Sequence, residues 1–163
     1  VDLVEPHGND AQLAALPPEW TRHRTILQRA PMELFDRLQD GDVLFYDGSH
    51  CAKTASDVTW LFFRILPSLR GGVLVHFHDI FLPDDYPEEW LLERGQTWNE
   101  QYLLQAFLMH NTAYRIVIAN RYLFSQDAPK LENLYKGVQP AFGCSLWMQK
   151  VSRTGQPTDA QKR

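Results

Sequence analysis

Two apolar runs in the first half of the chain end in aspartate and histidine residues, which are common in catalytic and metal-binding sites. Residues 43–47 read VLFYD and residues 73–79 read VLVHFHD. Runs that are nearly continuous in apolar residues are typical of strands buried on both faces. Between them, apolar side chains recur at helical spacing over residues 58–69, and Pro67 is expected to shorten the last turn of that helix. The pattern predicts a β-α-β unit in which both strands end at the same rim of a sheet.

Shorter segments on either side continue this alternation of strands and helices. Strands are expected at residues 1–6, 24–27, 114–124 and 142–151, and helices at residues 11–16, 31–38 and 99–111. Only a loop separates the last two strands, so they most simply pair as an antiparallel edge. The alternation indicates an α/β fold with a parallel sheet. We expect one domain over residues 1–151 and a polar tail over residues 152–163.

Composition and charge narrow the classes of function. The chain has 163 residues, 44% of them hydrophobic, which is enough for one domain with a substantial core. The formal net charge is −4 and no run of Lys and Arg forms a basic patch, so no nucleic-acid partner is expected. No apolar stretch approaches the ~20 residues that span a bilayer, and the chain does not open with a signal peptide, so no membrane partner is expected.

Cysteine and aromatic content bear on compartment and assembly. Cys51 and Cys144 are too few for a disulfide framework and lack metal-finger spacing. We expect both to be small buried hydrophobic residues in a reducing, cytoplasmic setting. The chain also contains five Trp and six Tyr, and exposure of these side chains would favour a homo-oligomer.

Asp47 and His50 stand three residues apart, just after the first apolar run. A carboxylate in that position is able to hold a metal ion or a ligand amine, and a histidine takes up a proton near neutral pH. In the simpler alternative, Asp47 caps the turn and His50 is a solvated loop residue. We expect the pair to belong to a site at the strand rim.

The second run contains His76 and ends in His78 and Asp79. On a strand the two histidines share a face and Asp79 takes the other. A His-x-His pair is typical of metal hydrolases, but the chain is shorter than the about 250 residues of a TIM-barrel hydrolase. His76 lies one pleat deeper and is expected to be a hydrogen-bonded core histidine. His78 and Asp79 are expected in the site.

Two further segments carry candidate binding residues. Glu5 ends the first strand, where an acid in nucleoside-binding α/β folds accepts hydrogen bonds from ribose hydroxyls. The loop over residues 81–98 is long, Pro-rich and acidic, as lids and binding loops often are. Its aromatic residues are expected to wall a substrate pocket: Tyr86, Trp90 and Trp98. Its acids are more simply solvated.

The helix expected at residues 99–111 begins with Asn99 and Glu100. Both residue types are favoured at helix starts, as a cap or in the first turn. Capping is a sufficient explanation for both, so neither is assigned to the site.

Three blocks of the chain together resemble a known family: DVLFYDGSH (42–50), SDVTWLFFRILPSLRGGVLVHFHDIFLPDDYP (56–87) and WNEQYLLQAFL (98–108). They resemble the class I S-adenosylmethionine-dependent methyltransferases, in particular a bacterial methyltransferase-domain group with little assigned chemistry. The resemblance covers roughly residues 1–150. It implies a Rossmann-like, mostly parallel sheet with a C-terminal antiparallel hairpin. It also implies methyl transfer from S-adenosylmethionine to a hydroxyl or amine of a small molecule.

The resemblance also implies roles for particular residues. Glu5 matches the position that holds the ribose hydroxyls of the cofactor. In the metal-dependent branch of the family, an acid after one strand and an acid-amide pair after the next bind a divalent cation. Asp47, His78 and Asp79 match those positions. His50 matches the position of the general base, with Asp47 placed to orient the acceptor or contact the cofactor.

Two departures from the family pattern change the expectation. His78 stands where the family has an oxygen ligand, which favours a metal that accepts imidazole over magnesium. A metal-free reaction with His50 as the base is the alternative. The Gly-rich turn after the family's first strand is absent, so we expect that strand and its cofactor loop to be missing from this chain.

Two functions follow from these patterns. The first is methyl transfer, with His50 and Asp47 as catalytic residues and Glu5 and Asp47 at the cofactor. The second is a non-catalytic methyltransferase-like domain that serves binding or assembly in a larger protein, which the missing glycine turn favours. A metal hydrolase is a distant third.

Overall fold

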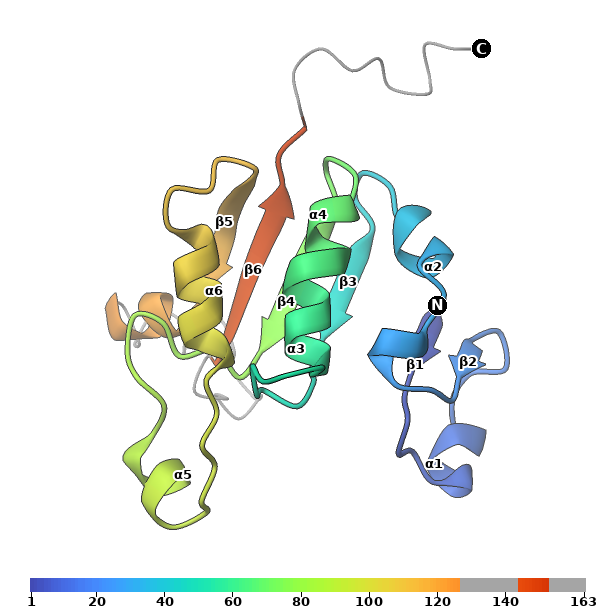
Figure 1. Ribbon diagram of the computed structural model, residues 1–163, viewed down its shortest axis with the longest axis horizontal. Helices are drawn as coiled ribbons and strands as arrows, with labels where there is room; N and C mark the ends of the chain where they lie inside the picture. The colour runs from blue at the N-terminus through green and yellow to red at the C-terminus, as the bar shows by residue number, and fades with distance from the viewer. Residues whose placement is uncertain (127–143, 153–163) are drawn as a thin grey trace.

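The computed structural model describes residues 1–126 and 144–152, which form two sheets with helices around them. The strands are β1 (Asp2–Val4), β2 (Thr21–His23), β3 (Val43–Tyr46), β4 (Leu74–His78), β5 (Tyr114–Ala119) and β6 (Ser145–Lys150). The larger sheet has the order β3-β4-β6-β5, and β1 and β2 form a separate two-stranded sheet (Figure 1). The described residues therefore have the expected α/β architecture.

Helices connect and cover these strands. They are α1 (Asp10–Ala14), α2 (Glu33–Asp36), α3 (Asp57–Trp60), α4 (Leu66–Ser68), α5 (Glu88–Leu92) and α6 (Glu100–Leu108), with a 3₁₀ turn η1 at Leu27–Arg29 and a π-helical turn η2 at Leu61–Ile65. Residues 120–126 are helical as well. Within the described ranges, no helix combines the length and the apolar character needed to cross a bilayer.

The β-α-β unit predicted from the two apolar runs is present. β3 and β4 pair in parallel, with Phe45 opposite His76. α3, η2 and α4 follow one another without a break and form the crossover helix. Ser56 caps this helix by accepting a hydrogen bond from the Thr59 N–H at 3.2 Å. The helix ends at Ser68, one residue after Pro67, which has no N–H to donate to the Phe63 carbonyl one turn earlier.

The last two described strands pair as an antiparallel edge of the sheet, as expected. β6 pairs antiparallel with both β5 and β4, so β6 lies inside the sheet and β5 at its edge. The side chains of Leu146 and Met148 in β6 are buried in the core, which accounts for this inner position. The strand predicted over residues 114–124 ends at Ala119, where a helix begins. The larger sheet thus has one parallel and two antiparallel pairings rather than a mostly parallel set.

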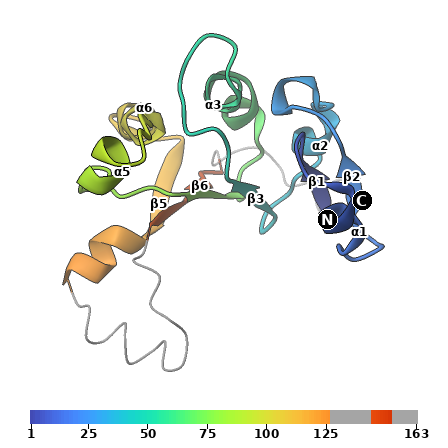
Figure 2. The same ribbon diagram turned by 90° about the horizontal axis from the view of Figure 1, so that it is seen from below.

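The core lies between one face of the larger sheet and the helices α3 and α6, which Figure 2 shows on the same side of the sheet. The ring of Phe62 in η2 lies 5.6 Å from that of Phe77 in β4 and 5.4 Å from that of Phe107 in α6. Burial of such large apolar side chains is the main favourable term in folding. This packing fixes the crossover helix and α6 against the strand that leads into Asp79.

The opposite face of the larger sheet carries a row of three rings, Phe45, His76 and Trp147. The ring centroids of Phe45 and His76 are 4.5 Å apart, and those of His76 and Trp147 are 4.6 Å apart. Phe45 is 59% exposed. The prediction that residues 43–47 are buried on both faces was therefore wrong, because no helix of the described ranges covers this end of the sheet (Figure 2).

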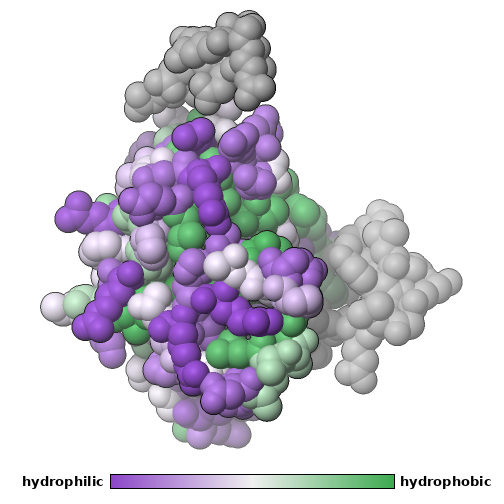
Figure 3. Space-filling model, turned by 90° about the vertical axis from the view of Figure 1, so that its right-hand side faces the viewer, coloured by the Kyte–Doolittle hydropathy of each residue, from purple (hydrophilic) through white to green (hydrophobic). Residues whose placement is uncertain are grey.

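The N-terminal segment forms a small unit beside β3. β1 pairs in parallel with β2, which begins at Thr21, earlier than the strand predicted at residues 24–27. The unit is held to the rest of the molecule by Phe35 of α2, which is buried in the core. The Gln28 side-chain amide also donates a hydrogen bond to the Ala55 carbonyl at 2.7 Å. Figure 3 shows this side of the molecule as mainly hydrophilic, with apolar patches between the polar side chains.

Candidate functional site

The rim where β3 and β4 end gathers three of the predicted site residues. Asp47 directly follows β3, Asp79 directly follows β4, and His50 lies three residues beyond Asp47. The Nε2 atom of His50 is 3.2 Å from Asp47 Oδ1 and 3.8 Å from Asp79 Oδ2. The structure therefore brings these three side chains together, as expected for the ends of neighbouring parallel strands.

A fourth residue, Glu100 at the start of α6, holds the other side of the His50 ring. His50 Nδ1 and Glu100 Oε2 form a hydrogen bond of 2.8 Å, and the Glu100 side chain is 0% exposed. The Asn99 side chain does not cap α6, because its Oδ1 accepts a hydrogen bond from the Ala52 N–H at 2.6 Å. Capping was therefore the wrong explanation for Asn99 and Glu100, since both side chains bond the loop after β3.

The sequence contains a signal for Glu100 that the capping explanation obscured. Leu104 is buried in the core, and Glu100 precedes it by one turn on the same face of α6. A carboxylate on the buried face of a helix needs a buried partner. Gln101 is also buried, and its Oε1 accepts a hydrogen bond from the Phe81 N–H at 3.0 Å. α6 therefore anchors the loop after β4 as well as the loop after β3.

Main-chain and ring contacts tie His50 to the segment that begins α6. The His50 carbonyl oxygen accepts hydrogen bonds from the N–H groups of Asn99 at 3.0 Å and Glu100 at 3.2 Å. The His50 ring stacks on Trp98, with the ring centroids 4.1 Å apart. His50 is therefore held in three ways: Glu100 bonds a ring nitrogen, Trp98 stacks on the ring face, and the N–H groups of Asn99 and Glu100 bond its main chain.

Three carboxyl groups surround this single imidazole and set its pKa. Burial by itself would lower the pKa of His50, but the hydrogen bond and the charge of Glu100 oppose this. The charges of Asp79 and Asp47 act in the same direction as Glu100, and together they raise the pKa of His50 above its usual value. Burial raises the pKa of Glu100, while the hydrogen bond from His50 partly offsets that rise.

Hydrogen bonds to Asp57 shape the loop after β3. Asp57 Oδ2 accepts hydrogen bonds from the Tyr46 hydroxyl at 2.9 Å and the Ser49 N–H at 2.8 Å. Burial would raise the pKa of Asp57, but the hydrogen bonds from Ser49 and Tyr46 bring the pKa below its usual value. At Gly48 a Cβ atom would lie only 2.2 Å from the Tyr46 hydroxyl oxygen. A glycine at this position is therefore a packing requirement of the site.

His50 and Asp79 both have a left-handed backbone, with φ values of 55° and 54°. Residues other than glycine seldom adopt this conformation, which costs on the order of 1 kcal/mol or more each. Such backbone strain persists only where the surroundings hold the residue in place, and it is concentrated at functional sites.

The two histidines of β4 lie on the open face of the sheet. His78 Nδ1 is 3.1 Å from Asp79 Oδ1, but its ring lies beside Phe45, with centroids 6.3 Å apart. His76 is buried between Phe45 and Trp147, and neither of its ring nitrogens has a hydrogen-bond partner among the described residues. Burial, followed by the charge of His78, lowers the pKa of His76. The prediction of a hydrogen-bonded core histidine was wrong, because ring packing holds His76.

The aromatic residues predicted as a substrate lid form one cluster beside His50. The Trp98 ring, which stacks on His50, lies 5.2 Å from the Trp90 ring and 6.0 Å from the Tyr86 ring. Phe81 joins them, 5.2 Å from Trp90. These rings meet edge to face, and Trp98 alone among them stacks on the imidazole.

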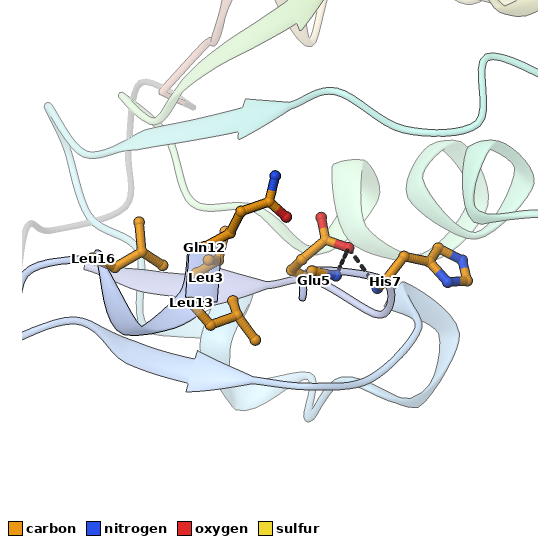
Figure 4. Close-up of a pocket in the computed structure, with 7 residues that line it drawn as sticks. Leu3, Glu5, His7, Gln12, Leu13 and Leu16 are labelled. Carbon is orange, nitrogen blue, oxygen red and sulfur yellow. Dashed lines mark hydrogen bonds between the residues drawn. The ribbon is translucent and has the colours of Figure 1, made fainter. Parts of the chain in front are cut away.

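Glu5 lies in the N-terminal unit, beside a hollow of about 360 Å³. Its Oε1 accepts hydrogen bonds from the N–H groups of His7 at 2.6 Å and Gly8 at 3.0 Å. Figure 4 shows the Glu5 carboxyl group at one end of this hollow, with apolar lining from Leu3, Leu13 and Leu16. The lining includes none of the side chains around His50, so the structure does not place Glu5 and His50 in one cavity.

Asp47, His50 and Asp79 each offer one ligand atom, and these atoms lie within 4.8 Å of one another. Two carboxylate oxygens and one imidazole nitrogen suit Mn²⁺, Fe²⁺ or Zn²⁺ better than Mg²⁺. Metal-bound histidines commonly donate their second ring N–H to a carboxylate, as His50 is placed to do with Glu100. The residues present therefore fit a divalent cation, with His50 in the set and the predicted His78 outside it.

The two cysteines are free and partly buried, whereas buried side chains were predicted. Cys144 lies at the rim beside Asp79. Burial, followed by a hydrogen bond to Asp79, raises the pKa of Cys144 to about 11. The thiol is therefore protonated at neutral pH.

Comparison with known proteins yields no family for this chain, since no family model, no curated protein and no solved structure matches it. Its function must therefore be inferred from the geometry of the rim and from the motifs of the sequence.

Proposed function

We propose that the protein is an S-adenosylmethionine-dependent methyltransferase that acts on a hydroxyl or amine of a small molecule. The observation that carries the proposal is the orientation of His50, with Nδ1 bonded to buried Glu100 and Nε2 at the rim, 3.2 Å from Asp47. A histidine held in this way is suited to take a proton from an acceptor. The motifs that resemble the class I methyltransferases support the choice of reaction.

His50 and Asp47 have separate roles in this reaction. His50 Nε2 receives the proton of the acceptor group, because Nδ1 is engaged by Glu100. Asp47, whose side chain is half exposed, orients the acceptor. The cofactor, when bound, supplies a methyl group on a good leaving group, so the protein contributes mainly positioning and proton removal.

Glu5 is the residue assigned to the cofactor. It follows the last residue of β1, and a carboxylate at that point of an α/β fold suits the paired hydroxyls of a ribose. The hollow of about 360 Å³ beside it offers apolar contacts from leucine side chains. A Rossmann-like arrangement of the sheet belongs to the same proposal.

A divalent cation held by Asp47, His50 and Asp79 would acidify an acceptor hydroxyl. In that arrangement Nε2 of His50 is a ligand and not a base, so the two roles exclude each other. Methyl transfer measured before and after treatment with EDTA decides between them. Loss of transfer that Mn²⁺ restores assigns His50 to the metal, and unchanged transfer assigns it the proton.

Cofactor binding and methyl transfer by the purified protein test the proposal. We expect calorimetry to show binding of S-adenosylmethionine, and S-adenosylhomocysteine to form when small phenols, sugars and amines are supplied as acceptors. His50→Asn introduces a residue that tolerates the left-handed backbone. It should bind the cofactor as the wild type does, yet slow transfer by roughly 10²-fold or more. A protein that does not bind the cofactor contradicts the proposal and leaves a non-catalytic binding or assembly domain.

A further inference from the structure

We propose that Glu100 is a positioning residue that keeps the proton of neutral His50 on Nδ1, so that Nε2 is the nitrogen available to react. The use of Nε2 rests on the proposed function, but the placement of the proton is a property of the folded chain alone. The inference applies equally to a base and to a metal ligand, because both need a free lone pair on Nε2.

The two ring nitrogens of His50 have different surroundings. Nδ1 makes the shorter contact, 2.8 Å to Oε2 of Glu100, whose side chain is completely buried. The contacts of Nε2 are longer, 3.2 Å to Asp47 and 3.8 Å to Asp79, and the Asp47 side chain is half exposed. Water can solvate the Asp47 carboxylate but does not reach Glu100. The buried carboxylate therefore gains more from a donated proton.

The opposite tautomer would place the Nδ1 lone pair of His50 against Glu100 Oε2. While Glu100 is ionised, these are two acceptors 2.8 Å apart with no proton between them, so they repel each other, and in a buried site this repulsion is weakly screened. Glu100 Oε1 is buried and has no hydrogen-bond partner among the described residues. Loss of the bond to His50 would leave the whole carboxyl group without a partner, which opposes this tautomer.

The Glu100 side chain has no solvent-exposed space into which it could turn, because it is 0% exposed. Its main-chain N–H bonds the His50 carbonyl oxygen at 3.2 Å, and the N–H of Asn99 bonds the same oxygen at 3.0 Å. Trp98 covers the face of the His50 ring, with the centroids 4.1 Å apart. The imidazole and the carboxyl group are therefore held as one unit, and the choice of tautomer follows from their geometry.

Nitrogen-15 NMR of the His50 ring tests the inference in the wild-type protein. The spectra are recorded in EDTA and at a pH above the raised pKa of His50, with His50→Asn to assign the signals. We expect a protonated Nδ1 and an unprotonated Nε2. A wild-type ring with its proton on Nε2 overturns the inference, whether or not the protein transfers methyl groups.

The Glu100→Gln variant provides a second test, because it removes the negative charge and retains the shape of the side chain. Its amide N–H can donate to Nδ1, so the ring should shift towards the form with the proton on Nε2. We expect kcat for methyl transfer to fall by roughly 10²-fold with KM unchanged. The matched control is Glu93→Gln at an exposed glutamate, which should alter neither the tautomer nor kcat.

The wild-type NMR spectrum and the E100Q variant test the inference independently of each other. A folded E100Q protein whose tautomer matches that of the wild type contradicts the inference. If E100Q does not fold, or if no methyl transfer is found in the wild type, the wild-type NMR spectrum decides alone by the criterion above. Failure of the proposed function therefore leaves the role of Glu100 open to direct measurement.

Discussion

One imidazole among three carboxyl groups is the feature of the rim that most affects its chemistry. Asp47, Asp79 and Glu100 all lie within 4 Å of a His50 ring nitrogen. The two aspartates were expected there, but Glu100 was not, because its place at a helix start had a sufficient local explanation. His50 and Glu100 are 50 positions apart in the sequence. Their contact depends on how α6 packs, which local sequence patterns do not reveal.

The raised pKa of His50 predicts how stability depends on pH. The folded protein holds this proton more tightly than the unfolded chain, in which a histidine has a pKa of about 6.5. The stabilisation from His50 is therefore fully present below about pH 6.5 and is lost as the pH rises through the raised folded pKa. Urea unfolding of the EDTA-treated protein across this window should show a falling free energy of unfolding. His50→Asn should lack that component, and an equal decline in both proteins would contradict the assignment.

The same pKa governs activity if His50 is the base. Only the neutral ring accepts a proton, so kcat should rise with pH through the raised pKa and then level off. A pH profile of methyl transfer with EDTA present measures this rise. A rising limb at or below the usual histidine value would contradict the base role.

At the scale of elements, the sequence predicted those strands and helices that have a clear apolar pattern of their own. The β-α-β unit from β3 to β4 was foreseen because both strands and the crossover helix have clear apolar periodicity. The place of β6 between β4 and β5 was not, since strand neighbours depend on contacts between distant segments. Strand alternation put His76 and His78 on one face. It did not show that Val75 and Phe77 take the helix-covered face, which leaves the histidines on the open one.

The crossover helix offers a matched pair of neighbouring phenylalanines. Phe62 is 2% exposed and packs on Phe77 and Phe107, whereas Phe63 is 67% exposed. Phe62→Ala should lower the free energy of unfolding by about 3–5 kcal/mol, because it leaves a cavity in the core. Phe63→Ala should change it by about 0.5 kcal/mol or less. Chemical denaturation measures both, and equal effects would contradict the packing described for this helix.

At the scale of the whole molecule, the N-terminal unit is joined to the larger sheet mainly through side chains. β1 and β2 pair with each other and not with β3, so no strand pairing crosses this junction in the described ranges. Phe35 enters the core and Gln28 bonds the Ala55 carbonyl. The junction therefore depends on packing rather than on a continuous sheet.

Phe35→Ala should loosen this junction selectively. The change removes a core contact worth about 3–5 kcal/mol, and hydrogen exchange should speed up in β1, α1 and β2 more than in β4. Ile26→Ala is the control in the same segment, because Ile26 is 41% exposed. Uniform loss of protection along the chain would instead show that the two parts unfold together.

The left-handed backbone at His50 and Asp79 has a consequence for anyone who engineers this chain. Glycine or asparagine at either position would relax the main chain, and Asp79→Asn would also thin out the negative charge crowded at the rim. At Asp79 both effects favour stability, so selection for heat resistance alone should replace this aspartate early, whereas loss of the His50 ring would leave buried Glu100 without its hydrogen-bond partner. Relief of this backbone strain and retention of the rim side chains therefore conflict. A thermostable variant of this protein is expected to have lost its activity.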